Sequence, residues 1–322
     1  MSLFKKRINL KPYEYPHILE YVDAIRHSYW VHTEFNYSAD IQDLKINLSS
    51  DEAAIIKKAM LAIAQIEVSV KTFWSKLYDW FPKPEFQAVG VTFAESEVRH
   101  IDAYSNLLEL VGLNDEFTKL LDEPAIARRI KYFEKMDKKI KYDQDFFHKV
   151  ILFSMFVEGV SLFSQFLIMM SFNKYKSALK GISNAVEATS KEEDIHARFG
   201  YEIINTIKKE HPEWWTKELQ SELYEATQEA FEAELGIIDW IYNGSELEFL
   251  PKKVVKEFVK DRFNKALKAV GLDEMFDTNP ALLDKTAWFV EETLSTKNID
   301  FFVKRSVAYS KKTKSFTEDD LF

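Results

Sequence analysis

Residues 150–170 of the chain, VILFSMFVEGVSLFSQFLIMM, are almost all apolar, and one carboxylate, Glu158, lies close to their middle. Three interpretations are open: a membrane span, a buried core helix with an unfavourable charge, and a buried core helix with a metal ligand. A lone span with a central glutamate would be destabilised by several kcal/mol, because no partner span could satisfy the charge. We therefore expect Glu158 to lie inside a protein core, and we expect no membrane partner.

The composition favours long helices. The chain has 322 residues, of which 46% are hydrophobic, and it contains only 8 glycines and 8 prolines. Few helix breakers and many strong helix formers predict helices rather than a strand-and-turn architecture. No linker rich in glycine, serine or proline divides the chain, so we predict one all-α domain over residues 1–305. The charged end, residues 306–322, is predicted to be a flexible tail.

Caps and breakers place the helix boundaries. Ser49 to Glu52 is typical of a helix start, and Gly112 is typical of a helix end. Between them and beyond them, the apolar periodicity predicts helices over residues 16–30, 51–80, 86–111, 123–139, 143–173, 181–209, 216–242, 252–270 and 280–295. Residues 31–48 are predicted to be irregular.

The composition also disfavours several classes of function. The chain has no cysteine, which excludes disulfides, thiolate ligands and thiol catalysis. Its net charge of -9 argues against sequence-independent binding to nucleic acid or to acidic membranes. The N-terminus has no apolar segment of signal-peptide length, and we expect a cytoplasmic protein.

Four acids lie in apolar stretches of four different predicted helices, and two of them are followed by a histidine three residues later. The set is Glu67, Glu97 with His100, Glu158, and Glu193 with His196. An acid three residues before a histidine should occur about once by chance in this chain, so each pair alone is weak evidence. The complete set is much more specific, because one glutamate from each of two helices plus Glu-x-x-His from two others is the ligand set of dinuclear carboxylate sites.

Charge explains why these residues belong together. Four buried carboxylates without cations would be very unfavourable and would take up protons. Two divalent metal ions neutralise them, and two imidazoles complete the coordination. Mixed oxygen and nitrogen ligands suit iron or manganese with open positions for oxygen chemistry.

Over nearly its whole length the chain resembles the small, radical-generating subunit of class I ribonucleotide reductase. The resemblance rests on the order of the carboxylates and Glu-x-x-His pairs above. It implies a ferritin-like helical bundle, with a dinuclear metal site in a four-helix core and flanking helices around it. It also implies that all six residues of the set are metal ligands. The implied activity is that of a ribonucleoside-diphosphate reductase beta subunit, an oxidoreductase that serves deoxyribonucleotide synthesis.

The resemblance assigns further roles. Tyr104, one turn after His100, stands where the family keeps its radical tyrosine, and Trp30 resembles the tryptophan that relays an electron. Tyr309 matches the relay tyrosine of the tail, and the acidic end with Phe322 resembles the peptide that docks on the large catalytic subunit. The implied mechanism oxidises the metal centre to a high-valent or radical state, which initiates thiyl-radical chemistry in that partner. The family also implies a homodimer.

Three residues distinguish this chain within the family. Glu67 stands where many members have aspartate, and members with glutamate there include manganese proteins. Glu192 replaces an aspartate that bonds the first histidine and the tryptophan, which leaves that part of the relay open. Lys71 lies one turn after Glu67, and we expect it to contact a ligand carboxylate or Tyr104, or to reach the surface instead. A Lys71–Tyr104 contact would keep Tyr104 reduced, so a Mn/Mn centre is favoured over iron or mixed Mn/Fe.

Two other functions share parts of this pattern. A ferritin-like dimetal oxidase of the ligand-binding oxidase or desaturase type has the same ligands but no use for a relay tail. A helical bundle for metal storage or scaffolding predicts many loosely bound ions rather than one fixed dinuclear centre. Tyr104 and Trp30 could then be ordinary core aromatics, and the tail a solubilising segment.

Overall fold

The computed structural model describes residues 2–136 and 141–294, apart from the side chains of residues 69–71, 135–136 and 294. Within this part of the chain every regular element is a helix and no strand is present, which confirms the all-α prediction. The α-helices are α1 (Leu19–His27), α2 (Ser38–Gln42), α3 (Ser50–Ser75), α4 (Leu77–Trp80), α5 (Pro84–Val111), α6 (Asn114–Lys119), α7 (Pro124–Met136), α8 (Asp143–Leu152), α9 (Phe163–Lys176), α10 (Lys180–Glu210), α11 (Lys217–Tyr242), α12 (Lys252–Ala269), α13 (Pro280–Leu283) and α14 (Ala287–Phe289). Wider π-helical turns occupy Asp43–Asn47, Phe153–Ser161 and Val290–Leu294. Short 3₁₀ turns occupy Pro16–Ile18, His32–Glu34, Leu120–Asp122, Pro212–Trp214 and Asp284–Thr286.

Local chemistry sets several helix ends where the sequence predicted them. The Ser49 hydroxyl accepts a hydrogen bond from the Glu52 amide, and the Glu52 carboxylate accepts one from the Ser49 amide, which forms a capping box at the start of α3. Gly112 ends α5 with a φ of 71°, a left-handed conformation that glycine adopts without strain. At the start of α11 the Thr216 hydroxyl accepts a hydrogen bond from the Leu219 amide and so caps that helix.

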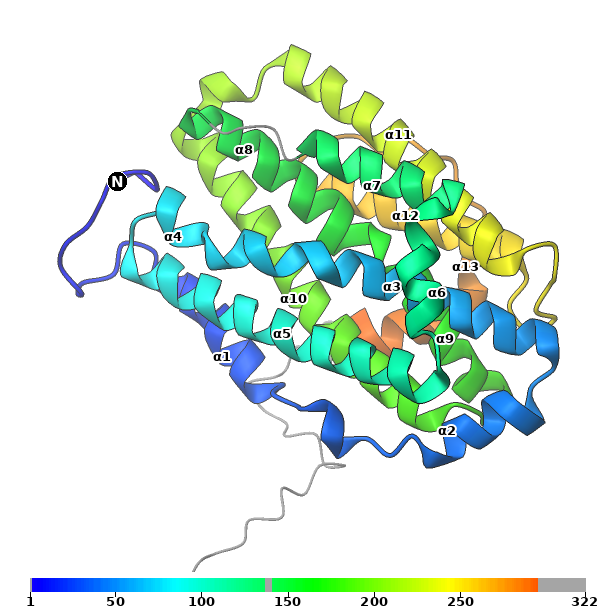
Figure 1. Ribbon diagram of the computed structural model, residues 1–322. Helices are drawn as coiled ribbons and strands as arrows, with labels where there is room; N and C mark the ends of the chain where they lie inside the picture. Colours follow the sequence, from blue (N-terminus) through cyan, green and yellow to red (C-terminus); the bar gives the residue numbers. More distant parts are fainter. Residues whose placement is uncertain (1, 137–140, 295–322) are drawn as a thin grey trace, which may run out of the picture.

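The long helices form one bundle (Figure 1). Helix α3 packs along α5. Helix α10 packs along α9 and along Phe153–Ser161, the π-helical turns that precede α9. Helix α1 lies against α5, and α7 packs on α11. Helix α12 contacts both α11 and the π-helical turns Phe153–Ser161. Four long elements, α3, α5, α8–α9 and α10, thus surround a common interior, and α7, α11 and α12 cover one of its sides.

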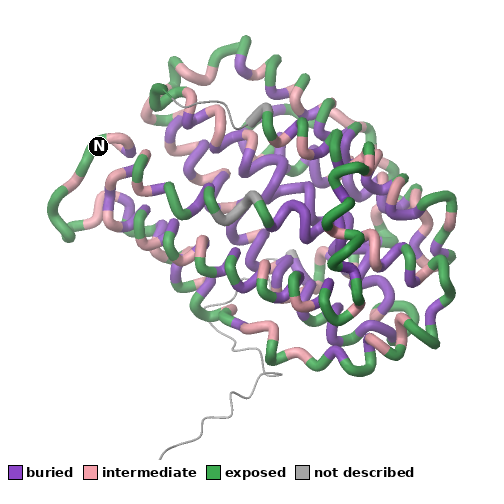
Figure 2. Tube along the Cα trace, viewed as in Figure 1, coloured by how far each residue is buried: buried purple, intermediate pink, exposed green. Residues whose placement is uncertain are grey.

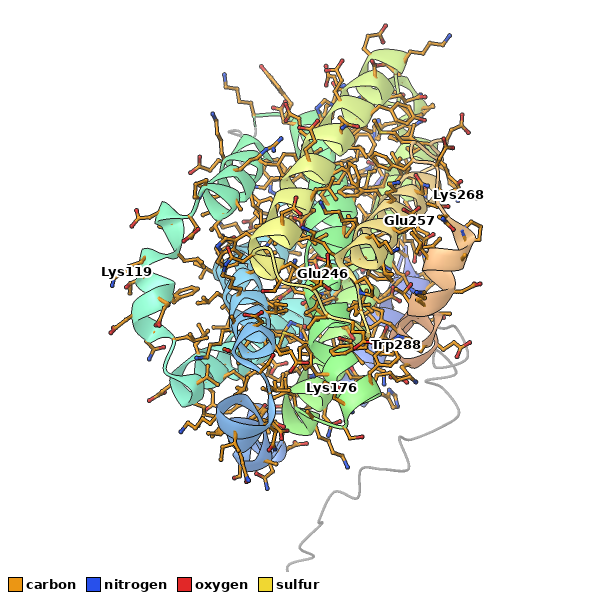
Figure 3. All side chains as sticks on the ribbon, turned by 90° about the vertical axis from the view of Figure 1, so that its right-hand side faces the viewer. Lys119, Lys176, Glu246, Glu257, Lys268 and Trp288 are labelled. Atoms are coloured by element: carbon orange, nitrogen blue, oxygen red, sulfur yellow. The ribbon has the colours of Figure 1, made fainter. Side chains whose placement is uncertain are left out.

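The interior is apolar and rich in aromatic rings. Buried residues line the inward sides of the long helices, and exposed residues lie around the outside (Figure 2). Trp74 packs edge-on against Phe93 and Phe153, with ring centroids 5.1 and 5.6 Å away. Charged side chains such as Lys119 and Lys268 project from the periphery of the bundle (Figure 3).

The apolar run around Glu158 belongs to this interior. The continuous helical stretch Asp143–Lys176 is long and apolar enough to cross a membrane, but 94% of its most apolar window is buried inside the protein. Glu158 itself has no exposed surface. The structure therefore agrees with the expectation of a core helix.

Four predicted segments differ from the structure. Residues 31–48 are not irregular but contain α2, because Asp40 and Asp43 accept hydrogen bonds from the amides of Leu179, Gly181 and Ile182 at the start of α10. The helix predicted over residues 51–80 breaks at Lys76, between α3 and α4. The helix predicted over 143–173 changes to π-helical turns in its middle. The last predicted helix, 280–295, consists of short pieces over its described residues, 280–294.

Candidate metal centre

Four helical elements bring the six predicted ligands to one place. Helix α3 supplies Glu67, α5 supplies Glu97 and His100, the π-helical turns supply Glu158, and α10 supplies Glu193 and His196. None of the six is more than 2% exposed. Their potential ligand atoms form two overlapping groups, in each of which all atoms lie within 4.8 Å of one another: Glu67, Glu97, His100 and Glu193, and Glu97, Glu158, Glu193 and His196. Glu97 and Glu193 belong to both groups.

Both histidines turn the same ring nitrogen toward the carboxylates. His100 Nδ1 lies 2.9 Å from Glu193 Oε1, and His196 Nδ1 lies 3.1 Å from Glu97 Oε1. The opposite nitrogens bond outside the cluster, His100 Nε2 to Glu192 Oε2 at 2.8 Å and His196 Nε2 to Ser96 Oγ at 3.0 Å. Such outer hydrogen bonds orient an imidazole so that its inner nitrogen faces a metal ion.

Many polar atoms of the cluster have no hydrogen-bond partner within the described part of the chain. These atoms are both oxygens of Glu67, both oxygens of Glu97, Nδ1 of His100, Oε2 of Glu158 and Oε1 of Glu193. Several approach one another closely, as His100 Nδ1 and Glu193 Oε1 do, but without hydrogen-bond geometry. Buried polar atoms are normally paired, and leaving them unpaired is unfavourable. Two divalent cations would satisfy these atoms, so the residues present fit a dinuclear centre.

The pKa values of the carboxyls reflect the same burial of several like charges in one place. Burial, reinforced for Glu158 by the charge of Glu193, raises the pKa of the Glu67 and Glu158 carboxyls well above their usual range. Burial acts in the same direction on Glu193, but the neighbouring imidazoles of His100 and His196 outweigh it and lower its pKa. Metal binding would therefore release protons from Glu67 and Glu158.

Glu192 connects the first histidine with the predicted relay tryptophan. Its Oε2 atom accepts hydrogen bonds from His100 Nε2 at 2.8 Å and from Trp30 Nε1 at 3.2 Å. The guanidinium of Arg99 also donates to both Glu192 oxygens at 3.2 Å and lies 5.7 Å from the Trp30 ring. The glutamate therefore makes the bridge that the replacement of aspartate had left open.

The comparison with protein families decides the identity of this arrangement. The family model described as ribonucleotide reductase, small chain, matches residues 7–282. The chain belongs to this family. It is thus a small subunit of ribonucleotide reductase, an oxidoreductase, and the resemblance seen in the sequence is confirmed.

Relatives extend the match over most of the chain. A ribonucleoside-diphosphate reductase subunit beta of Chlamydia pneumoniae is 25% identical over 296 residues, which cover 87% of this chain and 83% of that protein. One from Treponema pallidum (strain Nichols) is 20% identical over 317 residues, 96% of this chain and 88% of that protein. Among solved structures, the ribonucleotide reductase R2 subunit from Clostridium botulinum aligns with a TM-score of 0.76 at 17% identity, covering 87% of this chain and 89% of that one. The dimanganese(II)-NrdF of Streptococcus sanguinis aligns with a TM-score of 0.75 at 19% identity, covering 88% and 99%. These likenesses confirm the ferritin-like bundle with flanking helices.

The other residues that the sequence singled out in this small subunit have different outcomes. Tyr104 is only 2% exposed, and burial together with the charge of Glu67 raises its pKa well above the usual value. Thr189 acts in the opposite direction and lowers the pKa of Tyr104. The Lys71 side chain, Tyr309 and the tail lie outside the described residues.

Sequence reasoning missed a direct neighbour of the cluster. Trp74 is fully buried and donates from Nε1 to Glu158 Oε1 at 2.8 Å. Its ring centroid lies 5.9 Å from that of His196. Trp74 follows Glu67 by two helical turns on α3, and this spacing, which places both on one face of a helix, was the signal that could have found it.

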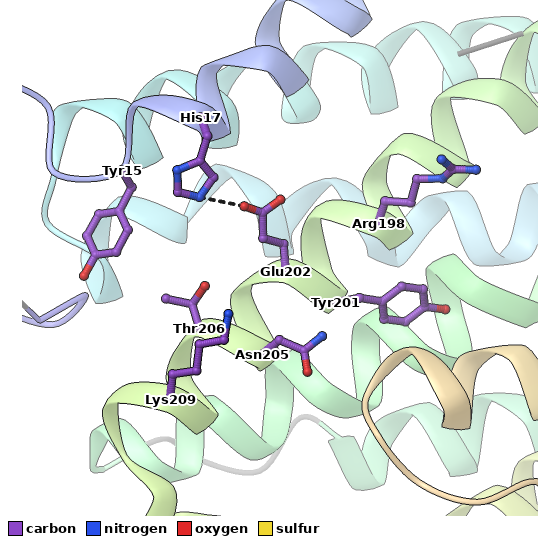
Figure 4. A pocket seen from close by; sticks show the side chains of 8 residues that line it. All are labelled: Tyr15, His17, Arg198, Tyr201, Glu202, Asn205, Thr206 and Lys209. Carbon is purple, nitrogen blue, oxygen red and sulfur yellow. Dashed lines mark ion pairs between the residues drawn. The ribbon is translucent and has the colours of Figure 1, made fainter. Parts of the chain in front are cut away.

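A surface pocket of about 550 Å³ lies elsewhere on the small subunit. It is lined along α10 and the N-terminal segment by Tyr15, His17, Arg198, Tyr201, Glu202, Asn205, Thr206 and Lys209 (Figure 4). His17 Nε2 and Glu202 Oε1 form an ion pair across it at 2.7 Å. None of the six candidate ligands lines this pocket, so the metal centre is a separate, buried site.

Proposed function

We propose that this chain is the beta subunit of a ribonucleoside-diphosphate reductase, and that its buried cluster holds two metal ions needed to start the reaction. The proposed ligands are Glu67, Glu97, His100, Glu158, Glu193 and His196. The observation that carries the proposal is the set of unpaired buried carboxylate and imidazole atoms, arranged in two overlapping groups. The curated relatives are named for the diphosphate substrate class, which supports the same assignment here.

The ligand groups suggest how the residues divide the work. Glu97 and Glu193 belong to both groups and would bridge the two ions, while the remaining four residues would each bind one ion. When bound, the two ions supply the one-electron oxidising power that the chemistry in the large subunit requires. The chain's own contribution is to fix the ligands, to exclude water from the buried cluster and to provide a path for the electron.

We assign the beginning of that path to Trp30, Glu192 and His100. The indole N–H and the imidazole N–H donate to one oxygen of Glu192, at 3.2 and 2.8 Å, so proton positions on both rings depend on this carboxylate. The two rings are nearly parallel, with an interplanar angle of 16° and centroids 5.8 Å apart. Tyr309, in the tail, is the proposed next carrier, and residues 306–322 would dock on the large catalytic subunit.

Manganese is the metal we favour, with iron or a mixed Mn/Fe centre as the other possibilities. The support is Glu67 in the first ligand position, Lys71 one turn later, and the fold shared with a dimanganese(II)-NrdF. In this proposal Tyr104 stays reduced and does not store the radical. Residues 1–305 would form the ferritin-like domain of a cytoplasmic homodimer, a state that is also named for a structural neighbour, the yeast Rnr4 homodimer.

A reconstitution experiment tests the function. Metal-free chain is loaded with Mn(II) or Fe(II), its bound metal is counted, and reduction of ribonucleoside diphosphates is measured with the large subunit. We expect two ions per chain and turnover only after metal loading. Glu158→Ala should lose the dinuclear site and the activity, whereas stoichiometric metal and full activity in this variant would contradict the ligand assignment. Deletion of residues 306–322 should abolish turnover while both ions remain bound.

A further inference from the structure

The segment that carries Glu158 has an unusual backbone. Phe153–Ser161, which we call the π segment, runs as a π-helix between α8 and α9, and all its residues are buried. π-Helical turns are rare, are usually single turns inside α-helices, and cluster at functional sites. The wider turn rotates the residues within it relative to an α-helix. The direction of Glu158 therefore depends on contacts that hold the π segment in this register.

One such contact is made by Arg262 of α12. Its Nε donates to the Gly159 carbonyl oxygen at 2.9 Å, and its Nη2 donates to the same oxygen. The guanidinium is largely buried, with the residue 8% exposed, and lies 3.7 Å from the centre of the Phe163 ring. Within the described part of the chain, all of its hydrogen bonds go to this carbonyl, which belongs to the residue next to Glu158.

A second buried guanidinium binds the end of the π segment. Arg129 of α7 donates from Nη2 to the Ser161 carbonyl oxygen at 3.3 Å and from Nη1 to the Ala62 carbonyl oxygen at 3.0 Å. Two further hydrogen bonds to Glu234 of α11, at 2.7 and 3.1 Å, hold the guanidinium in place. Since Ala62 lies on α3, this arginine ties the π segment to the helix that carries Glu67.

The π segment also packs closely against α10, the helix of Glu193 and His196. A side chain at Gly200 would overlap Ser154, and a side chain at Gly159 would overlap the Tyr201 hydroxyl. Both glycines thus permit a close approach of the two backbones. The π segment is therefore held by its close packing against α10 and by two arginines from other helices, α12 and α7.

We propose that Arg262 and Arg129 are positioning residues for the metal centre, which fix the register of the π segment so that Glu158 faces the other ligands. Arg262 acts next to Glu158 itself, and Arg129 acts at the end of the segment. Neither guanidinium contacts a candidate ligand side chain, so their action on the site passes through the backbone. This inference rests on the proposed function, because it requires that Glu158 binds a metal ion.

The test compares metal binding and local opening in the full-length chain. Arg262→Gln and Arg262→Lys are titrated with Mn(II), and hydrogen exchange of the π segment amides is followed in the same samples. The matched control is Lys265→Gln, because Lys265 lies on α12, is exposed and forms an ion pair with Asp261. For the second arginine, Arg129→Gln is compared with its exposed neighbour Arg128→Gln.

We expect Arg262→Gln to weaken the binding of one ion about tenfold, the lower end of the effect of losing an outer partner of a metal ligand. The other ion should bind as in the unchanged chain, and exchange should accelerate in residues 153–161 but not in α3 or α5. Arg262→Lys, which keeps one donor and the charge, should restore part of the affinity and also serves if the glutamine variant does not fold. The controls should behave as the unchanged chain.

Failure of the positioning role and failure of the proposed function would give different results. If Arg262→Gln binds both ions with unchanged affinities, or loses affinity and protection equally throughout the bundle, the positioning role is overturned. If the unchanged chain itself fails to bind two ions, the proposed function fails before the variants are compared.

Discussion

The buried ion pair between Arg129 and Glu234 allows a quantitative test of how the bundle is stabilised. Arg129 has no exposed surface, Glu234 is 3% exposed, and two hydrogen bonds join them. We consider Glu234→Leu, Arg129→Met and the double variant. Each single change leaves one charged group buried without its partner, whereas the double change removes both charges and leaves side chains of similar volume.

The expected magnitudes follow from this geometry. Breaking a buried ion pair by removing one partner costs about 3–5 kcal/mol of stability, whereas replacing both partners with apolar residues is often close to neutral. Arg129 also donates to two backbone carbonyls, each worth about 1 kcal/mol. We therefore expect each single variant to lose about 3–5 kcal/mol and the double variant to lose about 2 kcal/mol or less.

The assay is urea unfolding of the metal-free chain, followed by circular dichroism and compared through the apparent free energy of unfolding. An exposed pair on the same two helices, Arg128 with Glu232 at 2.6 Å, is the control, and removing it should leave the unfolding midpoint unchanged. Additive effects, with the double variant as unstable as the sum of the two single variants, would contradict a cost that comes from an unpaired buried charge. So would equal losses at the buried and the exposed pair.

Three further predictions concern the helix packing and the site. Gly200→Ala should lower the free energy of unfolding by about 1–3 kcal/mol, because the added methyl group would overpack against Ser154. Adding Ser154→Gly to the same chain should recover most of this loss. If Gly200→Ala alone is as stable as the unchanged chain in urea unfolding, the two backbones do not approach as closely as the structure shows. Glu192→Ala removes the hydrogen bond to His100 Nε2 and should weaken metal binding about 10–100-fold in a competition titration, and unchanged affinity would exclude an orienting role. Mn(II) at about 100 times its dissociation constant should stabilise the folded chain by about 2.7 kcal/mol per site. The measurement is a rise in melting temperature that a chelator reverses. If the melting temperature does not rise, specific Mn(II) binding is contradicted.

Much of the fold follows from local signals in the sequence. Ser49 and Gly112 mark helix ends by chemistry that acts within a few residues, and both boundaries are where the sequence places them. Helix α2 could not be predicted in the same way, because Asp40 acts on amides at the start of α10, far away in the sequence. The π segment has no local signal either, since its carbonyl partners are arginines from α7 and α12.

The site was predictable to a similar degree and for similar reasons. The six acids and histidines could be found because their residue types and spacings reflect what a dinuclear centre needs. The reach of Glu192 to both His100 and Trp30 depends on the distance between α10 and its neighbours, which only the structure gives. Trp74 was missed because an indole on an apolar helix is usually a core residue, and its donor role appears only once Glu158 is placed.

The most direct test of the central claim is to count the metal in active protein and to record its low-temperature electron paramagnetic resonance. We predict two redox-active ions per chain, bound through the six buried ligands, in preparations that support turnover with the large subunit. A manganese multiline signal without an organic radical would agree with the favoured metal and with a reduced Tyr104, whereas a tyrosyl signal would contradict that assignment of Tyr104. Active protein with no bound redox metal would contradict the dinuclear centre itself.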